Sequence, residues 1–189
     1  MTVLNVGEAD TEPNIRKALA IGADDAIRVN AAPKDAFFVA EQIAAVAKEG
    51  AYDVILMGKE SIDYNGFQVH GMVGELLGIP TIAPAQKLDL AGSVATLERE
   101  IEGGKEIVQV SVPFVASCQQ PMCEPRIPNM RGIMTARTKP LKVVPAVGEP
   151  ARTQVAGYAQ PPKKQGVKLI SADNAAELIH LLHTEAKVI

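Results

Sequence analysis

Residues 2–78 alternate three times between a short apolar stretch and an amphipathic stretch, and this alternation constrains the fold more than any other feature. The apolar stretches are Thr2–Gly7, Asp25–Asn30 and Tyr52–Gly58. The third, YDVILMG, is apolar almost throughout, which is typical of a strand buried on both faces of a parallel sheet. Strands that alternate with helices predict a doubly wound α/β fold with a mostly parallel sheet and right-handed crossovers.

Two amphipathic helices are predicted between these strands, because apolar residues recur there at helical spacing. The first has Pro13 in its first turn and Gly22 as a stop signal, and the second ends at Gly50. The residues expected on their apolar sides are Ile15, Leu19 and Ile21 in the first helix and Phe38, Val39, Ile43 and Val46 in the second.

The pattern changes after Pro80. Residues 86–117 alternate apolar and polar side chains with glycine-bearing turns, which predicts an antiparallel β-meander attached to the parallel sheet. A surface loop with a short helical turn should follow. We therefore expect an α/β domain over residues 1–145 and an extended C-terminal arm, residues 146–189, that ends in a helix.

The composition of the chain argues against several classes of function. A formal net charge of -3 provides no basic surface for nucleic acid, so no nucleic-acid partner is expected. No apolar run is long enough to span a bilayer and the N-terminus does not resemble a signal peptide, which favours a cytoplasmic protein without membrane insertion. Cys118 and Cys123 have no second ligand pair at zinc spacing, so a reduced pair is expected rather than a metal site or a disulfide.

The stretch GKESIDYNGFQVH leads from the third strand into a helix that starts near Val69. Ligands of open α/β sheets lie beyond the carboxyl ends of the strands, where helix N-termini favour anions. Gly66 permits close backbone approach, while Ser61, Asn65 and Gln68 can bind phosphate or sugar oxygens. The alternative is a polar turn capped by Asn65 without a ligand. His70 is expected on the surface at the start of the helix.

Three stretches together resemble the β-subunit family of electron transfer flavoproteins: Arg16–Val29, Ile55–Pro80, and Leu97–Val115 with its continuation to Leu141. The resemblance implies a Rossmann-like fold similar to adenine-nucleotide α-hydrolases. It implies that the domain over residues 1–145 binds a nucleotide and that the C-terminal arm packs on a partner subunit. It also implies a heterodimer with an α subunit that holds most of the FAD, while the β subunit holds AMP or, in bifurcating members, a second FAD. Electrons would pass from acyl-CoA dehydrogenases to a quinone oxidoreductase, and no catalytic residue is expected in this carrier subunit.

The resemblance places the nucleotide at the third strand and the loop that follows it. Many members that bind AMP read Asn-Gln-Thr where this chain reads Phe67-Gln68-Val69, and a Gln-Val pair also occurs in bifurcating members. The identity of the nucleotide therefore stays open between AMP and FAD. The expected cofactor-binding residues are Val6, Gly58, Ser61, Asp63, Asn65, Gly66, Gln68 and Val69.

The stretch EPRIPNMRGIMTAR matches the loop by which family members dock dehydrogenases, and we call residues 118–139 the recognition loop. An ungapped match from Glu124 places Met130 at the aliphatic anchor of that loop, whereas alignment on the Pro-Asn pair favours Ile127. Met130 is the preferred anchor, and Ile133 and Met134 are expected beside it.

This chain differs from the family pattern at the N-terminus, where family members begin with a further strand, loop and helix. Without them an open sheet edge and half of the nucleotide crevice would be exposed. Two alternatives remain from other classes of protein. A stand-alone adenine-nucleotide-binding module would lack the long arm seen here, and a ligase that uses ATP would need a triphosphate-binding motif that this chain lacks.

Overall fold

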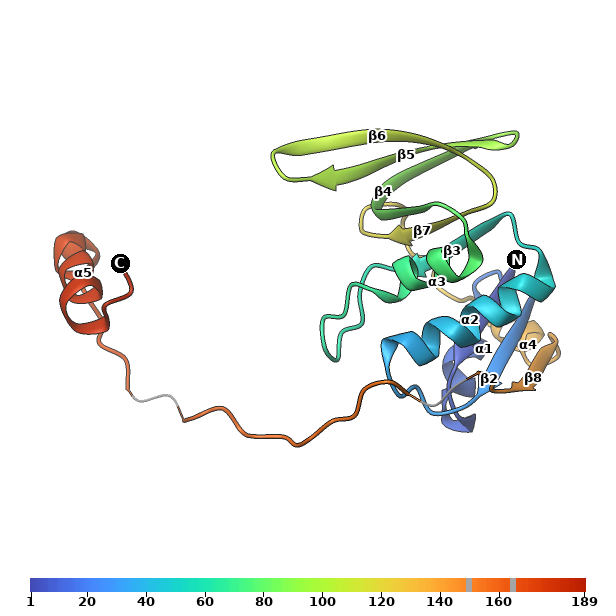
Figure 1. Cartoon of the computed structure of the whole chain (residues 1–189), viewed down its shortest axis with the longest axis horizontal. Helices are drawn as coiled ribbons and strands as arrows, with labels where there is room; N and C mark the ends of the chain where they lie inside the picture. The colour runs from blue at the N-terminus through green and yellow to red at the C-terminus, as the bar shows by residue number, and fades with distance from the viewer. Residues whose placement is uncertain (149–150, 164–165) are drawn as a thin grey trace. The chain divides into compact units, whose positions relative to one another are not determined.

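Two separate β-sheets organise the N-terminal part of the chain in a computed structural model (Figure 1). The first sheet has the strand order β1-β2-β8 and is entirely parallel. Its strands are β1 (Thr2–Val6), β2 (Asp25–Asn30) and β8 (Leu141–Pro145). The structure describes residues 1–148, 151–163 and 166–189. The mixed α/β fold predicted from the alternation of strands and helices is confirmed, but as two sheets rather than one.

The second sheet has the order β3-β7-β4-β5-β6 and combines parallel and antiparallel pairs. β3 and β4 both pair in parallel with β7, whereas β4, β5 and β6 form an antiparallel meander. Gly92 and Gly103 turn the meander with positive φ angles of 61° and 82°, which glycine adopts without steric cost. The strands are β3 (Val54–Gly58), β4 (Thr81–Ala91), β5 (Val94–Ile101), β6 (Gly104–Ser111) and β7 (Phe114–Cys118).

The predicted meander is correct for β4, β5 and β6 but wrong for its last part. Phe114–Cys118 leaves the meander and inserts as β7 between β3 and β4, parallel to both. All residues of β7 except Cys118 are buried, because the strand lies in the interior of the sheet. The local sequence pattern of a strand that inserts in parallel between two distant strands does not differ from that of a fourth antiparallel strand.

The helices lie against the sheets in two groups. α1 (Glu12–Ala20) and α4 (Met130–Ala136) share a core with the first sheet, and α2 (Ala36–Gly50) and α3 (Val69–Leu77) pack against each other and on β7. Phe38 is buried as expected, but Val39, Ile43 and Val46 are only half-buried, and alanines supply most of the buried face of α2. Ile21 is exposed, because α1 ends before it.

The exposed side of β3 contradicts the prediction of burial on both faces. Leu56 is 54% exposed. β3 pairs with β7 alone among the described strands, and β1 pairs with β2 alone. β1 and β3 are therefore edge strands of their sheets among the described residues.

The first compact unit, Met1–Gln154, extends past the expected domain boundary at residue 145. The second unit, Val155–Ile189, contains a short 3₁₀ turn (Ala172–Asn174), α5 (Ala175–Leu181) and a π-helical turn (Leu182–Ala186). Leu178 and Ile179 of α5 are exposed, so this helix buries little of its apolar face within its own unit. Residues 149–150 and 164–165 of the predicted arm lie outside the described residues. Every described helix is too short or too polar to cross a membrane.

Candidate nucleotide-binding site

The loop between β3 and α3 is closed by backbone contacts of its own. The Ser61 amide donates to the Gly66 carbonyl at 3.2 Å, and the two residues form an isolated antiparallel bridge. Asn65 has a positive φ of 51°, which asparagine tolerates better than most residues. A side chain at Gly66 would meet only the Gln68 amide, at an ordinary 3.9 Å. The packing of the protein alone does not require glycine there, and space for a ligand remains.

Asp63 is held by its own loop. The Ser61 hydroxyl donates to its carboxylate, and the Tyr64 amide donates to Asp63 Oδ1 at 2.9 Å. These two hydrogen bonds, the Ser61 contact first, lower the pKa of Asp63. The carboxylate therefore stays ionised and shapes the tip of the loop. Because an ionised carboxylate repels phosphate, Asp63 suits a sugar hydroxyl better than a phosphate oxygen.

The N-terminus of α3 has no cap from its own N-cap side chain. Its N-cap residue is Gln68, whose side chain makes no capping hydrogen bond, and the first turn has no acidic residue. The N-cap position of α3 is therefore Gln68 and not Asn65. The first amides of a helix lack intrahelical acceptors, and the helix dipole adds a partial positive charge there. These groups fit the phosphate of a nucleotide.

His70 is buried, with 5% of its surface exposed, so the expectation of a surface residue is wrong. Its ring meets the Phe67 ring edge-on, with the centroids 4.6 Å apart at an angle of 76°. Within the described residues neither ring nitrogen has a hydrogen-bond partner of good geometry. Burial lowers the pKa of His70, and the backbone of Lys59 partly opposes that shift. The imidazole is therefore neutral near pH 7.

Protonation of His70 should weaken folding at mildly acidic pH. The folded state holds the pKa of His70 below its ordinary value of 6.5, so the unfolded chain binds more protons as the pH falls through 6.5. We expect the free energy of unfolding to decrease from about pH 7 to about pH 5 more steeply in the native chain than in His70→Asn. Urea titrations at several pH values measure this, with exposed His180→Asn as the control. Parallel slopes for the native chain and His70→Asn would contradict it.

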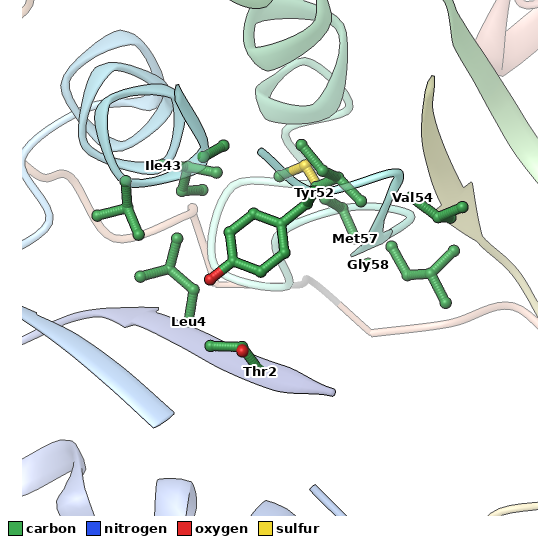
Figure 2. A pocket seen from close by; sticks show the side chains of 11 residues that line it. Thr2, Leu4, Ile43, Tyr52, Val54, Met57 and Gly58 are labelled. Atoms are coloured by element: carbon green, nitrogen blue, oxygen red, sulfur yellow. The ribbon is translucent and has the colours of Figure 1, made fainter. Parts of the chain in front are cut away.

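An apolar cavity of about 320 Å³ separates the unpaired edges of β1 and β3. Figure 2 shows Thr2 and Leu4 on one wall, Val54, Met57 and Gly58 on the other, and the ring of Tyr52 directed toward Leu4. Ile43 of α2 also lines it, which explains why this apolar residue of α2 is only half-buried. Gly58 thus lies at the candidate nucleotide loop and at this cavity at once, whereas Val6 is not among the lining residues.

Two polar residues of α2 hold the segment after β8, and sequence reasoning missed both. Gln42, 1% exposed, accepts from the Val147 amide at 2.8 Å and donates to the Val147 carbonyl at 2.7 Å. Asp35 caps α2 through the Phe38 amide at 2.8 Å and also accepts from the amides of residues 152 and 153. Because of these contacts, the first compact unit extends past residue 145. The signal for Gln42 was a polar residue within an otherwise apolar helix face.

Four apolar residues of the recognition loop are exposed to solvent. Ile127 is 91% exposed and Met130, the first residue of α4, is 74% exposed. Ile133 and Met134 are also exposed. Asn129 caps α4 by accepting from the Gly132 amide at 2.8 Å. The structure therefore leaves both candidate anchors free to contact a partner.

Arg16 of α1 fixes the end of α4. Its Nη1 atom donates to the carbonyls of Ala136 and Lys139 at 2.9 and 2.8 Å. The exposed residues of the recognition loop thus lie on α4 or just before it, and α4 is held against α1 and the first sheet. Within the described residues, no cluster of three His, Cys, Asp or Glu side chains could hold a metal ion.

The fold is that of a Rossmann-like α/β protein, and the N-terminus of α3 is its candidate anion site. A family model, the electron transfer flavoprotein domain, matches residues 1–148. The chain is 34% identical to electron transfer flavoprotein subunit beta of Bacillus subtilis, over 100% of this chain and 79% of that protein. It is also 34% identical to the mitochondrial β subunit of Arabidopsis thaliana, over 98% and 76%. The chain belongs to the electron transfer flavoprotein β-subunit family.

Proposed function

We propose that this chain is the β subunit of a heterodimeric electron carrier whose FAD is held mainly by an α subunit. The flavin supplies the redox chemistry, and this chain supplies a nucleotide site, part of the flavin environment and a docking surface. The observation that carries the proposal is the closed loop of residues 59–68 leading into the uncapped α3 in a chain of this family. Electrons would come from acyl-CoA dehydrogenases or similar flavoenzymes and leave to a quinone oxidoreductase.

The nucleotide held by this chain is proposed to be AMP, with its phosphate at the amides that begin α3. Gln68 and Val69 provide the first of these positions, and the loop around Ser61 and Asp63 would face the sugar. The Gln68-Val69 pair also suits a second FAD, which would make the complex a bifurcating one. Val6 and Gly58 end the two strands beside the cavity and would lie nearest the adenine.

The cavity between β1 and β3 supports a structural proposal as well. Two unpaired strand edges with an apolar space between them suit one additional strand, which would join both sheets into one. The further N-terminal strand of the family is the proposed occupant. An added strand would also cover the exposed Leu56 side chain and complete the crevice next to Gly58.

The decisive experiment co-expresses this chain with the α subunit, with and without an upstream extension, and quantifies the nucleotides released from the complex. One FAD and one AMP per heterodimer is the expected result, and two FAD would support the bifurcating alternative. Gln68→Ala should lower AMP content without lowering FAD content. No complex with either chain would overturn the proposal, and a complex with only the extended chain would support the missing strand.

Met130→Ala should weaken docking of a dehydrogenase while nucleotide content stays unchanged. An exposed aliphatic anchor that fills a partner pocket contributes about 2 kcal/mol or more, so we expect a loss of affinity of about 30-fold. Calorimetric titration of the purified heterodimer with an acyl-CoA dehydrogenase measures this. Ile127→Ala is the matched variant: a larger loss there would move the anchor to Ile127, and equal small losses would remove this loop from the docking surface.

A further inference from the structure

The two cysteines of the chain flank a single turn after β7. Cys118 is the last residue of β7, and Cys123 follows a turn closed by a hydrogen bond of 3.0 Å from the Met122 amide to the Gln119 carbonyl. A β-turn brings its first and fourth Cα atoms within about 7 Å. Cys118 and Cys123 are the residues immediately outside the two ends of this turn, and a disulfide between them requires a Cα separation of about 4.4–6.8 Å.

Both end residues of this turn, Gln119 and Met122, contact the second sheet. The Gln119 amide donates to the Ala85 carbonyl at 2.9 Å, and its side chain donates to Glu100 Oε2 at 3.0 Å. Met122, at the other end of the turn, packs against the buried cluster that includes Phe114. The turn that separates the two cysteines is therefore supported by the second sheet at both of its ends.

The two thiols differ in access. Cys123 is exposed, whereas Cys118 is half-buried. Burial raises the pKa of the Cys118 thiol, and the charge of Cys123 raises it further, while the backbone of Met57 partly opposes the shift. An oxidant in solution meets Cys123 first, and Cys118 is then positioned as the second, resolving thiol.

We propose that Cys118 and Cys123 form an intrachain disulfide when hydrogen peroxide oxidises the protein. The Cys123 thiolate attacks one peroxide oxygen, the O–O bond breaks, and a sulfenic acid and hydroxide result. The Cys118 thiolate then attacks the Cys123 sulfur, the S–S bond forms, and the S–O bond breaks to release hydroxide. In sum, two thiols and one peroxide give one disulfide and two waters. Without an oxidant both cysteines are free thiols.

The disulfide would join two functional segments. Cys118 lies beside Gly58 in the β3–β7 register, at the start of the candidate nucleotide loop. Cys123 directly precedes the exposed segment that carries Ile127. Oxidation therefore fixes the start of this exposed segment against β7 and restricts the conformations from which Ile127 and Met130 meet a partner. This docking consequence rests on the proposed function, but the disulfide does not.

Oxidation of the full chain with stoichiometric hydrogen peroxide tests the proposal. Because the chain has 2 cysteines, thiol titration should fall from two per chain to zero. The intact mass should fall by about 2 Da, and dithiothreitol should reverse both changes. Closure should accelerate as the pH rises, because more Cys118 is then thiolate. Retention of both thiols, a sulfinic acid at Cys123, or disulfide-linked dimers would overturn the proposal.

Two variants test the two steps of the oxidation separately. Cys118→Ser should stop at a sulfenic acid on Cys123 that dimedone traps, and Cys123→Ser should leave Cys118 largely unmodified. Trypsin should cut after Arg126 several-fold more slowly in the oxidised chain than in the reduced chain. Equal cleavage would overturn the effect on the recognition loop while leaving the disulfide in place. Failure of nucleotide or dehydrogenase binding would overturn the proposed function alone.

Discussion

Gly132→Ala is expected to destabilise the first unit by about 2–3 kcal/mol, because α4 packs on the backbone at the end of α1. A Cβ atom at this position would lie 2.3 Å from the Ala20 carbonyl oxygen, and that oxygen belongs to backbone that cannot rotate away. The helix would have to move off α1. The loss should appear as a lower midpoint of urea unfolding, and it should also weaken dehydrogenase docking through displacement of Met130.

Gly71→Ala is the matched control. Gly71 lies within α3, and a Cβ atom there would meet nothing within 4 Å. Because alanine is the better helix former, the control should be neutral or more stable by up to about 1 kcal/mol. Equal midpoints for the two variants would show that α4 does not depend on its close approach to Ala20.

Gln42→Leu should cost about 2–4 kcal/mol and release the segment after β8. The leucine removes both hydrogen bonds to Val147 and leaves a part-buried amide and carbonyl without protein partners. The segment can recover those hydrogen bonds only by moving into water. Hydrogen exchange should therefore report fast exchange of the Val147 amide, together with a lower midpoint of unfolding.

Gln109→Leu provides the comparison for this change. Gln109 is exposed on β6, and its side chain reaches Thr96 Oγ1 only at 3.4 Å. Replacement there should change stability by less than about 0.5 kcal/mol. If Gln42→Leu behaves like Gln109→Leu and Val147 stays protected, the amide of Gln42 does not hold the segment.

Local patterns predicted most of the individual elements. The strands at Thr2, Asp25 and Val54 and the helices at Glu12, Ala36 and Val69 were all expected from periodicity and from the helix stop signals. Hydrophobic period and turn chemistry act over a few residues, so they are readable without the fold. β8 was missed, because a five-residue stretch that contains Lys142 and ends in proline is also typical of a loop.

The candidate site was predictable in position but not in its local environment. The loop before α3 was located from the order of strand, glycine-bearing loop and helix. That His70 is buried, and that Asp63 is held by Ser61, depend on how the loop folds back on itself. Neither property follows from residue type or spacing.

The sequence by itself determined the class of fold, the family and the place of the candidate loop, because each rests on residues close together in the chain or on a match along its length. Only the tertiary structure decided which strands pair. It inserted β7 between β3 and β4, left β1 and β3 with unpaired edges, and tied Gln42 to Val147. Such pairings join segments distant in sequence, and their stability depends on the burial that the assembled sheets create.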